Sequence, residues 1–312
     1  MAVLASIDMG TNTFRLLVAE VQDRSFFKEI RSVKEITRLG EGFSADKRLK
    51  PAAIERAVTA LSRFRDVLKE HRVDDLIVVG TSAIREAKNQ REFIEEIKRR
   101  TGFELEVISG EQEALCTFLG ANFIMKNQSD PMLVMDIGGG STEFIGAEGE
   151  TPTFVMSTEM GVVHLTEKYL RSDPPASEEL KQLRSAIAQV IRPIVYDFPA
   201  QCRFVGTAGS VTTLAAIDQR LIEYDPAKIN GYPLSRAAVE RIFKELASMT
   251  LEQRCRVPGL EKGREDIIIA GILILLTVME LLGYDPIYVS DYGMREGILL
   301  DLYQRKFGEP GR

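Results

Sequence analysis

A turn of the Asp-x-Gly type occurs twice in the chain, as Asp8-Met9-Gly10-Thr11-Asn12-Thr13 and as Asp136-Ile137-Gly138-Gly139-Gly140-Ser141. A second phrase also returns, as Val79-Gly80-Thr81-Ser82 and as Val205-Gly206-Thr207-Ala208. Asp136 follows Asp8 by 128 residues and Gly206 follows Gly80 by 126 residues, so the two repeats keep nearly the same spacing. Two matches at matched offsets indicate a duplicated domain. The repeat predicts a cleft between two similar halves.

Each turn follows a short apolar run that indicates a buried strand, Leu4 to Ile7 in the first half and Met132 to Met135 in the second. Another strand-like run comes next, so we expect each turn to join a β-hairpin. Such a turn presents backbone N–H groups and hydroxyls to an anion, as a phosphate nest does. The Asp before it is suited to hold a Mg²⁺ that bridges the same phosphates. One such turn could be an ordinary glycine-rich hairpin, but the pair favours phosphate binding.

Length and composition are typical of a two-domain cytoplasmic enzyme. A chain of 312 residues is long enough for two domains with cores of their own. Cys116, Cys202 and Cys255 are scattered without a Cys-x-x-Cys pair, so neither a disulfide framework nor a zinc site is expected. The start of the chain shows no basic leader of the secretory kind. The longest apolar run, residues 267–279, is too short to span a membrane and predicts a core helix.

The chain has a net charge of −6, so its surface as a whole does not attract polyanions. Binding of phosphate chains would therefore need local clusters of Lys and Arg. Nucleic acid binding is not expected, because no aromatic-rich basic strand or zinc motif is present. A P-loop is excluded by the lack of a Gly-Lys dipeptide. No cysteine has an Arg six positions later, and only two His residues exist, so cysteine and histidine phosphatases are excluded as well.

Strand and helix patterns alternate along the chain. Residues 1 to about 40 predict a three-stranded meander. In the rest of the first half, helices are expected at 51–71, 91–100 and 111–123, and strands at 76–79 and 103–108. In the second half, helices are expected at 178–194 and 235–248, and strands at 203–205 and 286–290. The order βββαβαβα is that of a ribonuclease-H-like domain, used twice. The fold class predicted is therefore α/β.

Seven ordered motifs together resemble the exopolyphosphatase / guanosine pentaphosphate phosphohydrolase family. They run from the first strand to the last helix, and they are Asp8 to Arg15, Arg38 to Gly42, Gly80 to Ala87, Ser109 to Ala114, Asp136 to Glu143, Gly206 to Ser210 and Ser290 to Gly297.

The resemblance implies a fold of two actin-like, sugar-kinase-like domains around an interdomain active site. Their expected extents are 1–125, joined by a C-terminal helix at 297–312, and 126–296. It also implies hydrolysis of the terminal phosphate of polyphosphate or of pppGpp, the nucleotide of the stringent response, with Mg²⁺ or Mn²⁺ as the cofactor. Longer relatives carry a further C-terminal region, so preference between the two substrates and a possible homodimer stay open. No membrane partner is expected.

The resemblance also assigns roles to individual residues. Glu113 matches the catalytic base that orients and deprotonates the attacking water. Asp136 and Glu143 match the acidic residues around the metal, with Asp8 as the equivalent acid in the other half. The positions that match phosphate or substrate contacts are Thr11, Asn12, Thr13, Arg85, Gly138, Gly139, Gly140, Ser141, Gly206, Thr207, Gly209 and Ser210. The segment from Gly206 to Ser210 is expected to be a loop.

One departure from the family pattern is Gln112, where relatives often have a second Glu before the base. If that neighbour helps to bind metal, its loss would weaken the metal site. Two other readings stay open: a kinase of the same superfamily that phosphorylates a sugar or a carboxylate, and a non-enzymatic nucleotide-binding assembly protein. The Ser109 to Ala114 motif favours water as the acceptor.

Overall fold

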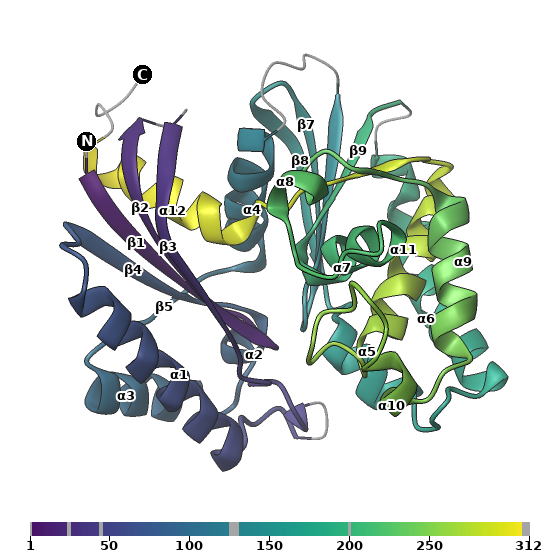
Figure 1. The fold of residues 1–312 in the computed structure, drawn as a ribbon, viewed down its shortest axis with the longest axis horizontal. Coiled ribbons are helices and arrows are strands. Elements are labelled where there is room, and N and C mark those ends of the chain that lie inside the picture. The colour runs from purple at the N-terminus through teal and green to yellow at the C-terminus, as the bar shows by residue number, and fades with distance from the viewer. Residues whose placement is uncertain (1, 24–25, 44–45, 125–130, 199–200, 308–312) are drawn as a thin grey trace. The chain divides into compact units, whose positions relative to one another are not determined.

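Two β-sheets organise the chain, one in each of two units (Figure 1). The computed structural model describes residues 2–23, 26–43, 46–124, 131–198 and 201–307. Unit 1 combines residues 1–123 with residues 293–312, and unit 2 is residues 124–292. The predicted domain boundary between residues 125 and 126 lies outside the described residues.

Unit 1 contains a five-stranded sheet in the order β3-β2-β1-β4-β5. β1, β2 and β3 form an antiparallel meander, and β4 and β5 continue it in parallel. Its strands are β1 (Ala2–Met9), β2 (Thr13–Asp23), β3 (Phe26–Ile36), β4 (Asp75–Gly80) and β5 (Glu106–Val107). Its helices are α1 (Pro51–Lys69), α2 (Ser82–Arg85), α3 (Gln90–Thr101), α4 (Gly110–Ile124) and α12 (Met294–Phe307).

Unit 2 contains a six-stranded sheet in the order β10-β11-β9-β6-β7-β8. Its strands are β6 (Met132–Ile137), β7 (Thr142–Glu148), β8 (Thr151–Thr158), β9 (Arg203–Thr207), β10 (Pro233–Leu234) and β11 (Ile287–Val289). Its helices are α5 (Val162–Tyr169), α6 (Ser177–Ile191), the 3₁₀ helix η2 (Arg192–Asp197), α7 (Ala208–Asp218), α8 (Pro226–Ile229), α9 (Arg236–Ala247), α10 (Leu251–Arg254) and α11 (Ile268–Leu282).

The two sheets share one strand order. The series β8-β7-β6-β9-β11 in unit 2 repeats β3-β2-β1-β4-β5 in unit 1, and β10 adds one antiparallel strand at the edge. The duplication seen in the sequence is therefore a duplication of topology, and the predicted α/β fold with two sheets is confirmed.

Both faces of β1 are buried, which explains why apolar residues occur on both of them. Side chains alternate between the faces of a strand. Ala5, Ile7 and Met9 pack with α1 and α3 in one core, while the Ser6 hydroxyl on the other face donates to the Arg295 carbonyl of α12 at 3.0 Å. Helices thus cover both faces of this sheet.

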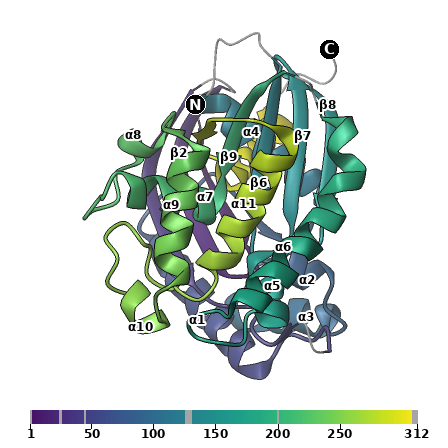
Figure 2. The same ribbon diagram turned by 90° about the vertical axis from the view of Figure 1, so that its right-hand side faces the viewer.

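The predicted core helix at 267–279 is α11, whose residues 268–279 are all buried. It packs with α6, α7 and α9 in the core of unit 2, in front of the sheet in Figure 2. It ends at Leu282 and is capped by Gly283, which takes the left-handed conformation (φ +71°) that glycine adopts without strain. Within the described residues, none of the helices is long and apolar enough to cross a membrane.

Four predicted elements differ from those observed. The strand predicted at 103–108 is reduced to Glu106–Val107. The helix predicted to reach residue 194 ends at Ile191, because Pro193 cannot continue an α-helix and a 3₁₀ turn follows. The loop predicted from Gly206 to Ser210 is wrong, since β9 ends at Thr207 and α7 begins at Ala208. The C-terminal helix begins at Met294, three residues earlier than predicted, and residues 308–312 lie outside the described part.

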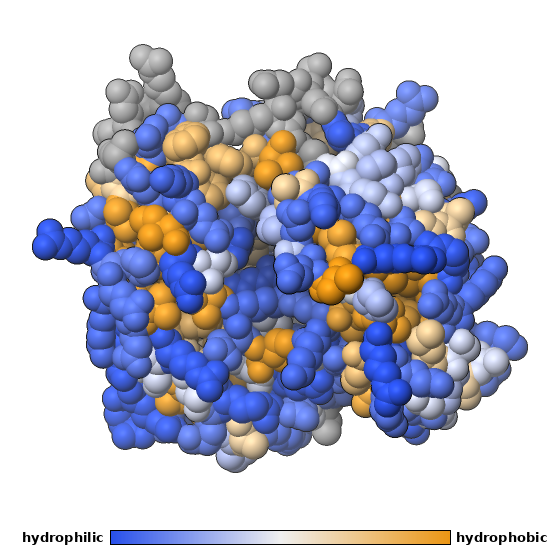
Figure 3. All heavy atoms as spheres, viewed as in Figure 1, coloured by the Kyte–Doolittle hydropathy of each residue, from blue (hydrophilic) through white to orange (hydrophobic). Residues whose placement is uncertain are grey.

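On the face drawn in Figure 3, hydrophilic residues predominate and hydrophobic ones form separate small groups. Exposed large apolar side chains lie in both units, as Phe26 and Ile30 on β3 and as Ile222 and Tyr224 between α7 and α8. Isolated exposed apolar residues of this kind are ordinary on a protein surface.

Candidate active site

The first turn joins β1 to β2, as predicted. The Gly10 N–H donates to the Thr13 carbonyl at 3.2 Å, and a Cβ on Gly10 would lie 2.9 Å from that oxygen, so the turn needs glycine. The Thr11 hydroxyl accepts the Ala83 N–H of α2 at 3.3 Å. The Asn12 carbonyl accepts two N–H groups from residues 37 and 38. These bonds hold the turn rigidly against two neighbouring segments.

The N–H of the first glycine is thus used inside the turn, in both copies, since Gly138 donates to the Ser141 carbonyl at 3.0 Å. An anion could therefore accept hydrogen bonds only from the N–H groups that come after Gly10 and Gly138 in each turn. In the described part of the chain, no backbone carbonyl accepts the N–H groups of Thr11, Asn12, Gly139 and Gly140. An anion-binding nest consists of consecutive N–H groups that are not used within the backbone.

Glu113 lies in the first turn of α4, and its side chain is largely buried. The Arg85 Nη1 donates to its Oε2 at 2.9 Å and also to the Ile108 carbonyl at 3.0 Å. Arg85 is delivered by α2, the short helix after β4. The structure therefore brings two predicted site residues, Arg85 and Glu113, into direct contact. The neighbouring Glu86 binds Ser82 and Lys47 instead.

Gln112 caps the helix that carries Glu113. Its Oε1 accepts the Ser109 N–H at 2.9 Å, and the Ser109 hydroxyl accepts the Gln112 N–H at 3.1 Å. This reciprocal pair is a capping box, which Gln forms as well as Glu does. Helix capping therefore explains why Gln is suitable at position 112, where relatives often have Glu.

Cys116 lies one turn after Glu113 on the same helix. Burial, and to a smaller extent the carboxylate of Asp301, raises the pKa of its thiol to about 12. Because the thiolate is the nucleophilic form of cysteine, this thiol is not a nucleophile at neutral pH.

The second turn joins β6 to β7 and places two carboxylates opposite one another. Asp136 is the direct cross-strand partner of Glu143, and the two are 9% and 1% exposed. Residues directly opposite in an antiparallel pair point to the same face of the sheet. The Ser157 hydroxyl donates to Glu143 Oε1 at 2.7 Å. In unit 1 the partner of Asp8 is Arg15, so only the second turn carries an acidic pair.

This acidic pair fits a divalent cation. Mg²⁺ is commonly bound through one or two carboxylates together with water and substrate phosphates. Two neighbouring buried carboxylates, held by β6 and β7, provide such oxygen ligands. No group of three or more His, Cys, Asp or Glu side chains able to hold a metal by themselves occurs in the described ranges, so the remaining ligands would come from water and substrate.

The β9–α7 junction carries the other predicted contacts of unit 2. Gly206 and Thr207 end β9, and Gly209 and Ser210 lie in the first turn of α7. Ala208 between them has φ +65°, a conformation that costs a non-glycine residue of order 1–3 kcal/mol and that recurs at functional sites. A Cβ on Gly209 would lie 1.8 Å from Nη2 of Arg264, so a larger residue there would displace the guanidinium group.

Arg264 is a residue that the sequence patterns did not single out. Its side chain is 8% exposed, its Nε donates to Glu261 Oε2 at 2.5 Å, and its Nη groups lie over the backbone of Gly209. It therefore places a cation at the start of α7. Its only signal in the sequence is its position shortly before the long apolar run, and hydrophobic periodicity assigns no role to an Arg at such a position.

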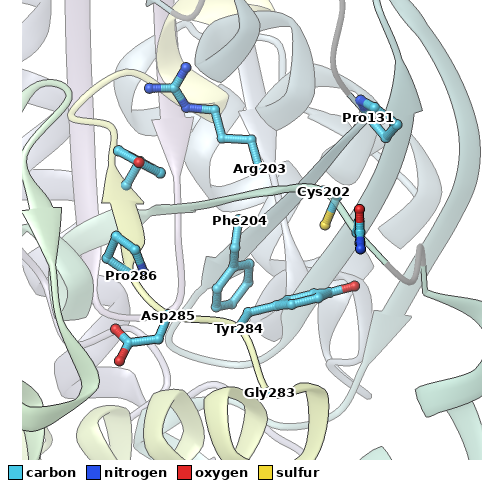
Figure 4. A pocket seen from close by; sticks show the side chains of 10 residues that line it. Pro131, Cys202, Arg203, Phe204, Gly283, Tyr284, Asp285 and Pro286 are labelled. Carbon is cyan, nitrogen blue, oxygen red and sulfur yellow. The ribbon is translucent and has the colours of Figure 1, made fainter.

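A pocket of about 770 Å³ lies elsewhere in unit 2, at the amino-terminal ends of β6 and β9 (Figure 4). Tyr284, Cys202 and Arg203 are among its lining residues, and none of the predicted site residues is. In the figure Arg203 points away from Phe204 and Tyr284. A ligand site usually has a few polar groups that converge on one point. The second turn and the β9–α7 junction lie at the opposite, carboxyl-terminal ends of β6 and β9, where ligands bind in open α/β sheets.

The predicted residues thus form two sets. In unit 1, Asp8 lies near the end of β1, the turn Thr11–Thr13 leads into β2, and Arg85 and Glu113 lie on the helices that follow β4 and β5. In unit 2, Asp136 lies near the end of β6, Glu143 lies near the start of β7, the turn 138–141 joins these strands, and the junction 206–210 lies between β9 and α7.

Comparison with known proteins agrees with these features. The model of the Ppx/GppA phosphatase family matches residues 17–306. Exopolyphosphatase 2 of Mycobacterium tuberculosis is 34% identical, over 96% of this chain and 98% of the relative. Two solved structures are similar over nearly their whole length. The family member from Aquifex aeolicus has TM-score 0.83, 32% identity and 99% coverage of both chains, and an exopolyphosphatase from Cytophaga hutchinsonii has TM-score 0.89, 29% identity and 97% coverage of both.

The family match includes Arg85, Glu113, Asp136 and Glu143, and the structural likeness extends over both duplicated units. Sequence, topology and overall structure lead to one assignment: the chain belongs to the Ppx/GppA phosphatase family.

Proposed function

We propose that this protein removes the terminal phosphate of inorganic polyphosphate or of pppGpp, with Glu113 orienting the attacking water and Mg²⁺ or Mn²⁺ held beside Asp136 and Glu143. Membership of a phosphatase family supports phosphoanhydride hydrolysis. The name of the relative from Mycobacterium tuberculosis favours polyphosphate. The observation that carries the proposal is the buried carboxylate of Glu113, held at 2.9 Å by Arg85.

Phosphoryl transfer to water depends on positioning more than on covalent chemistry. A base must lie within hydrogen-bond reach of the water whose proton it takes. Glu113 suits this role because its helix is capped at its start by Ser109 and Gln112 and its carboxylate is fixed by Arg85. Such a carboxylate can hold a water in one orientation and accept its proton.

Each turn offers donors to phosphate groups. In unit 1 these are the N–H groups of Thr11 and Asn12, and in unit 2 those of Gly139 and Gly140, none of which has a backbone acceptor. Donors fixed in a turn stabilise an anion with little reorganisation. The Nη groups of Arg264, whose Nε is paired with Glu261, add donors next to Gly209. Local donors of this kind can bind phosphate although the net charge of the chain is −6.

A divalent ion at Asp136 and Glu143 would neutralise charge on the transferred phosphate. The two carboxylates would bind it directly or through water, and Ser157 would keep Glu143 in place. Asp8 is the equivalent acid in unit 1, but its cross-strand neighbour Arg15 makes a cation less favourable there.

The test is a phosphate-release assay on the purified chain with Mg²⁺ and, in parallel, short polyphosphate, long polyphosphate, pppGpp and ATP. Each is run with and without glucose or acetate. We expect release from polyphosphate or pppGpp at a rate that neither acceptor changes. Transfer that depends on glucose or acetate would instead identify a kinase. A lack of turnover on every substrate would refute the proposal. A cytoplasmic location and a homodimer stay predictions of the sequence.

A further inference from the structure

Helices α4 and α12 of unit 1 meet backbone against backbone (Figure 1). A Cβ on Gly297 of α12 would lie 1.6 Å from the Cys116 carbonyl oxygen of α4. A Cβ on Gly120 of α4 would lie 1.9 Å from the Gly293 carbonyl oxygen, just before α12 begins. No side chain separates the helices at these two points. We call this pair of contacts the glycine seat.

Hydrogen bonds and ion pairs fix α12 to the sheet along its length. The Arg295 carbonyl accepts the Ser6 hydroxyl of β1 at 3.0 Å. The Tyr303 hydroxyl donates to the Gln22 carbonyl of β2 at 2.6 Å, and Lys306 pairs with Asp75 of β4 at 2.7 Å. Because these contacts tie α12 to the sheet, a wider separation at the seat must either break them or displace α4.

The seat lies close to Glu113 along α4. Cys116 follows Glu113 by three residues, which is nearly one helical turn. Side-chain contacts between helices can repack when one helix moves. A contact between backbone atoms has no such freedom, so it sets the separation of the two helices directly.

We infer that Gly120 and Gly297 are positioning residues for Glu113, because the glycine seat sets the distance at which α4 holds that carboxylate. The inference rests on the proposed role of Glu113 as the base. It assigns the two glycines no contact with substrate or metal.

The size of the expected effect follows from the overlap. An ordinary contact needs at least 3.4 Å, so an alanine at position 297 must separate the two backbones by close to 2 Å. Misplacement of a catalytic group by about 1 Å can cost about 10²-fold in rate. A folded Gly297→Ala protein should therefore lose about 10²-fold in kcat with KM within about threefold of wild type, because its phosphate-binding turns are untouched.

The experiment measures kcat and KM for phosphate release by Gly297→Ala and Gly120→Ala, with circular dichroism to normalise each rate to folded protein. Cys116→Ala is the matched control, since it changes the side chain of the residue in contact and leaves its carbonyl unaltered. We expect the control to keep kcat within about twofold, and both glycine variants to lose kcat selectively.

Folded glycine variants with wild-type kcat, or with a loss confined to thermal stability, would overturn the inference. If neither glycine variant folds, the double variant Tyr303→Phe/Lys306→Ala provides the test. It removes two exposed contacts that hold α12 on the sheet, so the position that the seat passes on to α4 becomes less well defined. We expect kcat to fall about threefold at unchanged KM, and an unchanged kcat would refute the role of the seat. Failure of the proposed function has a different signature: wild type releases no phosphate, or Glu113→Gln is fully active.

Discussion

Replacing Glu113 with Gln separates catalysis from binding more directly than any other change in this chain. The substitution keeps the size of the side chain and an amide oxygen that can accept from Arg85, but it removes the proton acceptor. A lost general base costs about 10²- to 10⁴-fold. We therefore expect kcat to fall by at least about 10²-fold while KM stays within about threefold.

The structure limits how much of that loss could come from unfolding. The substitution weakens the charge-assisted hydrogen bond of 2.9 Å between Arg85 and Glu113, whose side chains are 25% and 11% exposed. A hydrogen bond to a charged group is worth about 1.5–3 kcal/mol, and a neutral replacement retains part of it, so roughly 1 kcal/mol of stability is at stake. That corresponds to about 2–4 °C in Tm for domains of this size. At 25 °C the variant should remain folded.

The assay is initial-rate phosphate release on the best substrate from the panel above, with binding to Glu113→Gln measured separately by calorimetry. Glu111→Gln is the control, because Glu111 is exposed on the same helix two residues away and should be nearly silent. Turnover of Glu113→Gln within a few-fold of wild type would refute the assignment, since an acid outside the chemical step has no reason to affect kcat.

Three further outcomes are expected. Excess EDTA should abolish turnover and Mg²⁺ should restore it, while Asp136→Asn should raise the Mg²⁺ concentration needed; full activity in EDTA would contradict this. Of the three thiols, exposed Cys255 should react first with a thiol reagent at pH 8 and Cys116 only on unfolding, because burial raises its pKa to about 12. Burial, and then the hydrogen bond to Asp218, raises the pKa of Tyr232 from 10.0 to about 12. Its stabilisation should therefore be complete below pH 10 and lost as the pH rises toward 12, and Tyr232→Phe should remove that part of the alkaline unfolding curve.

Local pattern alone was enough for much of this protein. The Asp-x-Gly turns, the hairpins that contain them and the core helix α11 follow from short-range signals, namely apolar runs, glycine and helical periodicity. These signals act over a few residues, so they survive in the folded chain. The capping box of Ser109 and Gln112 is also local and was readable as Ser-x-x-Gln before a helix. The resemblance to relatives obscured it, because it presented Gln112 as a missing acid.

Contacts between distant segments needed the tertiary structure. Arg85 pairs with Glu113 across 28 residues, Arg264 lies against Gly209, and Gly297 meets Cys116. No periodicity encodes such pairs, because each depends on how whole helices pack on a sheet. The sequence determined which residues could bind phosphate and metal, through the local backbone they require. Packing decided which side chain holds the carboxylate of Glu113 and how closely its helix approaches α12, since those distances arise only when the sheet brings remote segments together.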